Sequence, residues 1–400
     1  MRSPCAPLMA AMSVLAAMRL RALVTALNVG SGLAHPAIKT LGDSVKIQSL
    51  VGALGLALLV STGAAQSQTV THKLTFASGY PATFAWTDEQ IKTFLPNVNK
   101  ELEKAGSRHR VDWNVAVGGT LATMPNMLDA VSTGIADMGH VVHLFEPARL
   151  PLQNVVSAAP FATNDPRIAT RVLHDMQKTM PAMQKSWANL NLVYLTSYSF
   201  DSYLLIASKP VKSVSDVKGM KIAAAASNTL WLEGTGATPV AATMGTAYND
   251  IKTGVYEAAI NSAMLSAAGK MYEVAPQIIK TGFGAINAFD IVFNKSSWDR
   301  LPAEVRQAIQ RASDAHQESM VARIERETDA ALQLMTKHGA TVVEFSAEEK
   351  AKWANTLPNI AERWAAPLEA KGLPAREVLR TYVDGLRKAG AQPARDWTRP

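Results

Sequence analysis

Two stretches of the sequence, NMLDAVSTGIADMG at residues 126–139 and TAYNDIKTGVYEAAIN at residues 246–261, share one arrangement. Each begins with apolar residues at helical spacing, reaches a glycine that can end a helix, Gly134 or Gly254, and continues through an acidic residue into a short apolar strand. A strand, a helix and a further strand in this order predict α/β layering with parallel pairing. The repetition therefore predicts two similar α/β lobes.

The segments before the first stretch continue this alternation. Strands are predicted at residues 71–80 and 111–117, and between them a helix at 87–105 that Pro96 should kink. The strand within the first stretch is predicted at residues 135–139. The first lobe therefore alternates strands and helices from its start.

Two later segments are long enough to connect the lobes. Residues 192–208 are typical of two strands or of one long strand that crosses from lobe to lobe. From Pro302 to Lys337, apolar residues recur on one stripe and predict a helix of about 36 residues, roughly 54 Å long. That length exceeds one small domain, so we expect this helix to lie along both lobes.

Shorter signals place two more helices. A helix is predicted at residues 228–235, after a strand that starts at GMKIAA, residues 219–224. Ser346 and Glu349 have the spacing of a capping box at the start of another helix.

The amino-terminal segment has the layout of a secretory signal. One basic residue, Lys46, precedes an apolar run from Leu50 to Val60 and small residues that end at Ala65, so we predict a signal peptide at 45–65 that is cleaved after Ala65. We interpret residues 1–44 as an extension from a start codon assigned too early; the alternative is a genuine extended leader.

Charge and cysteine content exclude several classes of function. The whole chain has a formal net charge of +7, but residues 1–65 hold five of its 40 basic residues and one of its 33 acidic ones, which leaves 35 against 32, or +3. Such a small excess predicts no nucleic-acid partner. Cys5 is the single cysteine and lies before the cleavage point, so the exported chain has no disulfide, which suits a bacterial periplasmic protein.

A run of four alanines, residues 223–226, follows Lys221 and Ile222 where a buried strand is expected. Buried strands favour large branched residues that pack on a pleated surface, whereas alanine leaves space. We expect the backbone to pass a cavity here that is kept open for another molecule.

The chain resembles the solute-binding proteins of tripartite ATP-independent periplasmic (TRAP) transporters, of the dicarboxylate-binding type. The resemblance covers about residues 70 to 345, and it rests on GGTLATMPNMLDAVSTGIADMG, APF at 159–161, KPVKSVSDVKGMKI, GATPVAATMGTAYNDIKTGVYEAAIN and FNKSSWDRLPAEVRQAIQRA. It implies an α/β, two-lobed periplasmic binding protein fold with crossing hinge strands and a long spine helix. The expected lobes are residues 66–200 plus 288–330 and residues 201–287 plus 331–400.

The resemblance also implies a ligand site, from which this sequence departs. Most members of the family have an arginine at the position of Ala223, where its two parallel donors hold a ligand carboxylate. A second ligand arginine would fall at Ser202 or Tyr203 and is absent too. Asn261 matches a family asparagine that contacts the ligand. Either another cation reaches the ligand, or the ligand carries no exposed carboxylate.

Other candidate pocket residues come from their places next to strand ends and the alanine run. The candidate ligand-binding residues are Trp86, His140, Tyr198, Tyr203, Ala223, Asn228, Trp231 and Asn261. Each has a structural alternative: a tryptophan can be core, a hinge tyrosine can be solvated, and an asparagine can cap a turn. His140, His143 and Glu146 have a spacing that could hold a metal, but it also occurs by chance, and we predict no metal and no cofactor.

The sequence contains no nucleophile elbow, phosphate-binding glycine loop or zinc-protease helix, so we expect no enzyme. The favoured interpretation is a monomeric periplasmic subunit that captures a small polar organic solute, an organic acid or related compound, and delivers it to TRAP membrane subunits. The alternative is an extracytoplasmic ligand sensor for a signalling receptor. A periplasmic hydrolase or lyase that uses His140 and Asp201 is the least favoured.

Overall fold

The computed structural model describes residues 68–399 except Ala225 and residues 243–245. The predicted leader extension, 1–44, and signal peptide, 45–65, lie outside the described residues. The described residues belong to one compact unit. Within the described part, no helix is both long and apolar enough to cross a membrane.

The described residues form one mixed sheet of nine strands, in the order β2-β1-β3-β8-β4-β7-β5-β6, with β9 paired to β8. At one end, three parallel strands pair: β1 (Val70–Ser78), β2 (His109–Ala116) and β3 (Met138–Val142). At the other end, three more do the same: β5 (Lys221–Ala224), β6 (Thr238–Ala241) and β7 (Ala258–Asn261). The α/β layering predicted from the two repeated stretches is therefore confirmed.

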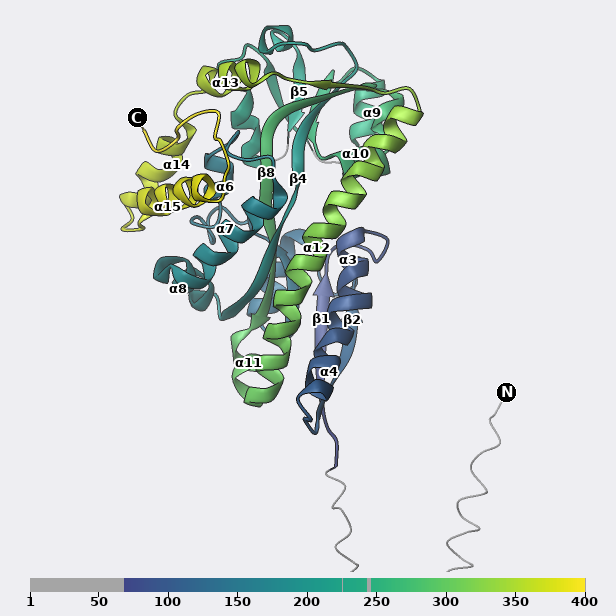
Figure 1. Cartoon of the computed structure of the whole chain (residues 1–400), viewed down its shortest axis with the longest axis vertical. Coiled ribbons are helices and arrows are strands. Elements are labelled where there is room, and N and C mark those ends of the chain that lie inside the picture. Colours follow the sequence, from purple (N-terminus) through teal and green to yellow (C-terminus); the bar gives the residue numbers. More distant parts are fainter. Residues whose placement is uncertain (1–67, 225, 243–245, 400) are drawn as a thin grey trace, which may run out of the picture. The chain divides into compact units, whose positions relative to one another are not determined.

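Two long antiparallel strands, β4 (Leu192–Ala207) and β8 (Gln277–Asn294), join the two ends of the sheet and run side by side through its middle (Figure 1). Residues 192–207 are thus one crossing strand, the second of the two interpretations. The register of the pair slips between Ser199 and Ser202, and also on either side of that point. Such irregularities locally bend a strand. The predicted lobe boundary at residues 200 and 201 falls within this irregular part and stays a prediction.

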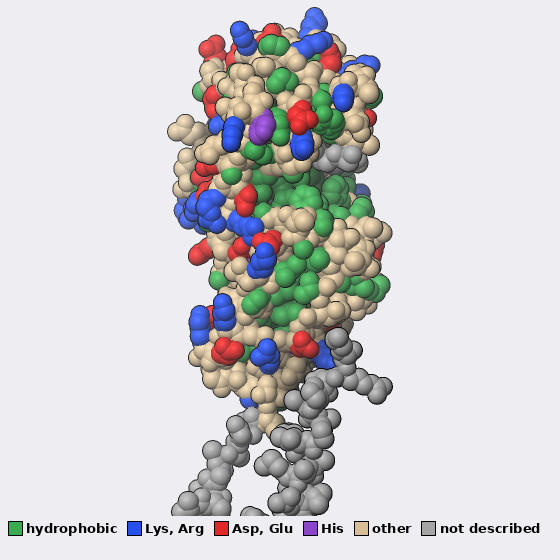
Figure 2. Space-filling view, turned by 90° about the vertical axis from the view of Figure 1, so that its right-hand side faces the viewer, with side chains coloured by type: hydrophobic (Ala, Val, Ile, Leu, Met, Phe, Trp, Pro, Cys, Tyr) green, Lys and Arg blue, Asp and Glu red, His purple; other side chains and the backbone are tan. Residues whose placement is uncertain are grey.

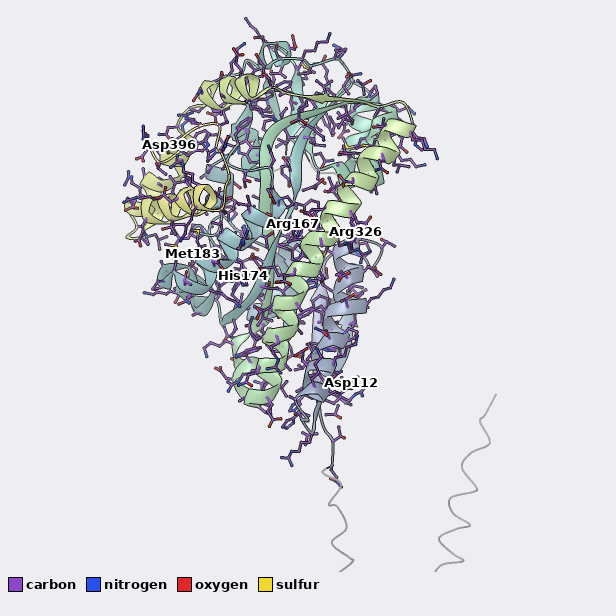
Figure 3. All side chains as sticks on the ribbon, viewed as in Figure 1. Asp112, Arg167, His174, Met183, Arg326 and Asp396 are labelled. Atoms are coloured by element: carbon purple, nitrogen blue, oxygen red, sulfur yellow. The ribbon has the colours of Figure 1, made fainter. Side chains whose placement is uncertain are left out.

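The predicted long helix is confirmed as α12 (Ala303–Lys337), and Pro302 is its N-cap residue. It contacts α4 (Leu95–Lys104), β4 and α10 (Ala263–Ala268), so it packs along both ends of the sheet. Arg167 of α7 (Pro166–Thr179), which Figure 3 labels, forms a bidentate ion pair with Glu325 of α12.

The predicted helix at 87–105 is divided into three parts. It begins as α3 (Ala85–Glu89), continues as a π-helical turn, η1 (Gln90–Phe94), and ends as α4. Pro96 lies in the first turn of α4, where a missing N–H is tolerated. The irregular part of this helix is therefore the π-helical turn that precedes the proline.

The prediction of a strand at 135–139 was wrong by three residues. Gly134 ends α5 (Met127–Ser132) with a φ of +81°, as the glycine signal predicted, but the next residues form a turn. The Asp137 carboxylate accepts a hydrogen bond from the backbone N–H of Thr75, which fixes that turn to β1. The strand starts only at Met138, so His140 lies inside β3 and not in the loop after it.

The remaining elements complete both faces of the sheet. The α-helices are α6 (Val155–Ala158), α8 (Pro181–Asn189), α9 (Ala247–Lys252), α11 (Lys295–Arg300), α13 (Ala347–Thr356), α14 (Ile360–Glu369) and α15 (Ala375–Lys388). The short turns are η2 (Met124–Asn126), η3 (His143–Phe145), η4 (Val214–Val217), η5 (Ala226–Leu232) and η6 (Met271–Glu273), and the last strand is β9 (Thr341–Glu344). The predicted helix at 228–235 is the 3-10 turn η5. Helix α14 lies against α6, and α15 lies against α6 and α7, so the carboxyl-terminal helices also contact elements that we placed in the first lobe.

The predicted capping box at the start of α13 is only half formed. The Ser346 hydroxyl accepts a hydrogen bond from the backbone N–H of Glu349, as expected. The Glu349 carboxylate instead accepts from the backbone N–H of Val214, so it connects α13 to η4.

Candidate functional site

A cavity of about 130 Å³ is lined from both groups of parallel strands, β1 to β3 and β5 to β7, and from β4 between them. Its described lining comes from the segment after β1 and from β3, η3 and β8 on one side, from β5, η5, β7, α9 and α10 on the other, and from β4 between them. The lining residues are Tyr80, Val142, Leu144, Phe145, Phe200, Tyr203, Ala223, Ala224, Asn228, Ala242, Ala247, Tyr256, Ala259, Ile260, Asn261, Leu265 and Phe289. Figure 2 shows hydrophobic side chains gathered across the middle of one face, where the surface is hollowed.

One side of the cavity is made of small side chains, which we call the alanine wall: Ala223, Ala224, Ala242, Ala247 and Ala259. Ala223 of β5 pairs directly with Ala259 of β7, so their methyl groups lie on adjacent strands. A larger residue at these positions would fill the cavity. The described part of the alanine run thus borders open space, in agreement with the expectation from the sequence.

The opposite side is an aromatic wall that consists of Tyr80, Phe145, Phe200 and Phe289. The Phe289 ring centroid lies 4.8 Å from that of Phe200 and 6.2 Å from that of Tyr80. These separations are typical of favourable aromatic pairs. The wall therefore offers flat apolar surface to a bound molecule.

Two asparagines supply polar groups to the cavity. Asn228 is 1% exposed, and its Oδ1 has no hydrogen-bond partner among the described residues. Asn261 is held in place, since its Nδ2 donates to Oγ of Ser266 at 3.0 Å and lies 3.3 Å from the sulfur of Met271. An unpaired buried acceptor is costly, so Asn228 is suited to accept a hydrogen bond from a ligand.

The cavity carries no formal charge on its described lining residues. The internal residues that the structure leaves undescribed, Ala225 and residues 243–245, include no charged type in the sequence. Burial raises the pKa of Tyr80 to about 12. Burial, with a smaller contribution from the nearby Asp250, raises the pKa of Tyr256 to about 12. Both phenols are therefore neutral donors near pH 7.

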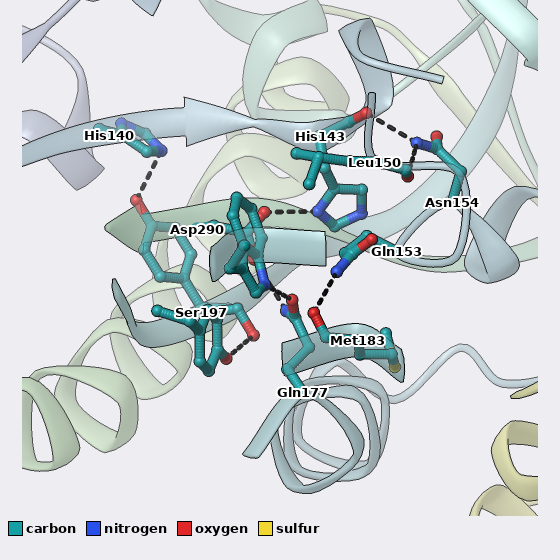
Figure 4. A network of polar contacts seen from close by, with 12 residues as sticks. His140, His143, Leu150, Gln153, Asn154, Gln177, Met183, Ser197 and Asp290 are labelled. Atoms are coloured by element: carbon teal, nitrogen blue, oxygen red, sulfur yellow. Dashed lines mark hydrogen bonds and ion pairs between the residues drawn. The ribbon is translucent and has the colours of Figure 1, made fainter. Parts of the chain in front are cut away.

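Tyr198 and His140 meet behind the aromatic wall and do not line the cavity. The Tyr198 hydroxyl lies 3.2 Å from Nε2 of His140 (Figure 4). It also accepts a hydrogen bond from Nε2 of Gln90 at 3.1 Å. The Tyr198 and His140 rings lie 5.4 and 4.9 Å from Phe289, respectively. Burial, followed by the nearby His316, lowers the pKa of His140 to about 3, so this histidine is neutral and cannot replace the missing arginine.

A second buried network fixes the segments that carry the aromatic wall. Nδ1 of His143 lies 2.6 Å from Oδ2 of Asp290, and Oδ1 of Asp290 accepts from Nε2 of Gln177 at 2.9 Å (Figure 4). Nδ2 of Asn154 donates to the backbone oxygen of His143 at 2.8 Å. Because Phe289 precedes Asp290 and η3 begins at His143, these bonds hold both segments in one position.

The other candidate residues have different surroundings. Tyr203 lines the cavity beside Trp231, with ring centroids 6.1 Å apart, but Trp231 is fully buried and donates through Nε1 to the backbone oxygen of Ser157. Trp86 packs behind the aromatic wall, 5.6 Å from Phe289. The structure thus brings Tyr203, Ala223, Asn228 and Asn261 together at the cavity, whereas Trp86, His140, Tyr198 and Trp231 lie outside its lining.

Asp201 and Glu146 have structural partners. Oδ2 of Asp201 accepts from the backbone N–H of Ala263 at 2.9 Å and so caps α10, and burial raises the pKa of Asp201 to about 6. Glu146 pairs with Arg149 at 2.8 Å, while His143 pairs with Asp290. Over the described residues, no group of three His, Cys, Asp or Glu side chains is placed to hold a metal ion.

Sequence reasoning missed most of the aromatic wall. Phe200 lies within the crossing segment SYSFDSY, 197–203, from which we selected the tyrosines and passed over the phenylalanine. Tyr80 lies two residues after β1 ends, at a strand end where ligands of α/β proteins often bind. Phe289 carries no local signal, because its place depends on how β8 pairs with β3 and β4.

The mixed α/β fold, with a cavity lined from both ends of its sheet, is that of two-lobed solute-binding proteins. Residues 83–367 match the family described as bacterial extracellular solute-binding protein, family 7, and the chain belongs to this family. The family is a class of binding receptors and not of enzymes, in agreement with the expectation from the sequence.

Individual relatives are more distant. The C4-dicarboxylate-binding periplasmic protein DctP of Rhodobacter capsulatus is 27% identical over 175 residues, 43% of this chain and 52% of that protein, so the match spans about half of its length. The ectoine-binding periplasmic protein TeaA of Halomonas elongata is 20% identical over 317 residues, 78% of this chain and 92% of that protein. A TRAP periplasmic solute-binding protein of Desulfovibrio salexigens has a similar fold, with a TM-score of 0.68 and 23% identity, over 80% of this chain and 96% of that one.

Proposed function

We propose that this chain is the periplasmic solute-binding subunit of a TRAP transporter, which captures one small organic solute and delivers it to the membrane subunits. The cavity is the observation that carries the proposal, because its walls come from both ends of one sheet. The irregular part of the β4 and β8 pair lies between these ends, so bending there would bring the alanine wall and the aromatic wall together around a solute.

Export and assembly state complete the proposal. The segment that ends at Ala65 directs the chain to the periplasm, and the mature chain acts as a monomer. DctP and TeaA are both named as periplasmic binding proteins, which supports this location. None of the relatives reported above is a signalling sensor, so the alternative of a sensor subunit has no support.

Solute binding and closure can be tested together. Purified protein is screened by thermal shift against small acids, amines, polyols and neutral amides, because a solute that binds only the folded state raises the melting temperature. For a solute that binds, small-angle X-ray scattering should show a smaller radius of gyration. Uptake of that solute into vesicles with TRAP membrane subunits should require this chain. If no solute in any of these classes binds, the proposed function is wrong.

A further inference from the structure

We propose that the cavity selects a small uncharged aromatic solute that carries an N–H or O–H donor, and that it discriminates against carboxylates. This inference rests on the proposed function and names the class of solute that the site accepts. It contrasts with what the resemblance implies, since the arginine that would hold a carboxylate is replaced by Ala223.

The described lining of the cavity carries no formal charge. A carboxylate there would exchange water for methyl groups, aromatic rings and neutral phenol and amide groups, with no cation among the described lining residues to compensate. His140, whose ring contacts Tyr80 and Phe289, is neutral at pH 7. A bare cation also lacks a counter-charge there, because no described lining residue is acidic. An uncharged solute avoids both costs.

The size and shape of the cavity suit a single aromatic ring. An apolar cavity of roughly 150 Å³ admits benzene, and this cavity, about 130 Å³, is close to that size. Phe289 and Phe200 provide flat faces on one side, while Ala223 and Ala259 leave room on the other. A single ring fits between an aromatic surface and a surface of methyl groups.

Asn228 supplies a buried hydrogen-bond acceptor. Oδ1 of Asn228 is buried and has no partner among the described residues, so a solute with an N–H or O–H donor would satisfy it. A site with a buried polar group of this kind discriminates strongly against analogues that lack the matching donor. Asn228 is thus a specificity-determining residue in this proposal.

Three probes of similar shape and different charge test whether the cavity prefers an uncharged solute. Calorimetry at pH 7 with the purified exported protein should show benzamide binding at least tenfold more tightly than benzoate, and more tightly than benzylamine. Equal or tighter binding of benzoate, or of benzylamine, overturns the inference but leaves solute binding intact. If none of the three binds while a non-aromatic solute from the screen does, the inference is also wrong and the proposed function stands.

A fourth probe tests how much the N–H donor of the solute contributes to binding. Acetophenone has the shape of benzamide but no N–H, so the native protein should bind it about tenfold more weakly. In Asn228→Ala the two probes should bind equally, because the acceptor that distinguishes them is gone. Asn249→Ala, an exposed asparagine on α9, is the matched control and should retain the tenfold preference. If Asn228→Ala still binds benzamide tenfold more tightly than acetophenone, another group accepts the hydrogen bond and the role given to Asn228 is wrong.

Discussion

The aromatic wall and the alanine wall face the same cavity but differ in what lies behind them. Behind the aromatic wall, buried polar side chains form specific hydrogen bonds, as between His143 and Asp290 or between Tyr198 and His140. On the other side, Ala223, Ala247 and Ala259 of the alanine wall belong to a small apolar cluster that includes Ile251. The difference suggests a division of roles: the aromatic wall depends on the stability of its lobe, whereas the alanine wall can change specificity at little cost to folding.

The largest effect should follow from breaking the network behind the aromatic wall. Asp290→Ala leaves Nδ1 of His143 and Nε2 of Gln177 without their acceptor in a fully buried place. We expect the free energy of unfolding, measured in urea, to fall by about 3–5 kcal/mol. Asp299→Ala, at a half-exposed ion pair with Lys295, is the control and should cost less than about 1 kcal/mol. Equal losses in both variants would show that the network does not support the wall.

The next effect concerns specificity and belongs to the alanine wall. Ala223→Arg places a guanidinium in the cavity, where its paired donors match a carboxylate. Benzoate should then bind about 100-fold more tightly than to the native protein, or about 2.7 kcal/mol, and benzamide should bind more weakly. Ala223→Met adds bulk without charge and should not create benzoate binding. If the methionine variant also gains benzoate, packing and not charge decides specificity.

A smaller loss of stability should appear when the pH is lowered. Burial lowers the pKa of His316 from 6.5 to about 4, and both its ring nitrogens lack hydrogen-bond partners among the described residues. Below pH 6.5 the unfolded chain binds a proton that the folded chain does not, so stability falls as the pH falls from 6.5 towards 4. At pH 5 this one group should cost about 2 kcal/mol relative to pH 7.

His316→Phe should remove that part of the acid sensitivity and keep the stacking on Phe94, whose ring centroid lies 5.0 Å away. Urea unfolding at pH 7 and pH 5 measures the change. His338→Gln, at an exposed site, should leave the dependence on pH as it is. An unchanged pH dependence in His316→Phe would contradict the assignment.

The two walls also differ in how well the sequence predicted them. Only the part of the alanine wall that belongs to the alanine run, Ala223 and Ala224, was predicted, because its signal is local: alanines stand where a strand should be apolar and bulky. The aromatic wall was not, since Phe289 reaches the cavity only through the pairing of β8 with two other strands. His140 was expected in a loop because the residue at which a strand starts is hard to predict from sequence. The turn that Asp137 fixes to β1 delays the start of β3 to Met138, so His140 lies within the strand. The long helix and the repeated α/β order were predictable because hydrophobic periodicity over many residues is a strong signal.

The smallest effect should come from the polar edge of the alanine wall. Asn261→Ala removes an amide from the cavity lining, and we expect benzamide to bind about tenfold more weakly, or about 1.4 kcal/mol, with the protein still folded. Ser266→Ala is the matched control, because it removes the hydroxyl that accepts from Nδ2 of Asn261 but no lining group. Calorimetry with both variants separates direct contact from positioning. A tenfold loss in Asn261→Ala alone indicates contact with the solute, similar losses in both indicate that Ser266 orients the amide, and unchanged affinity in Asn261→Ala would remove this residue from the site.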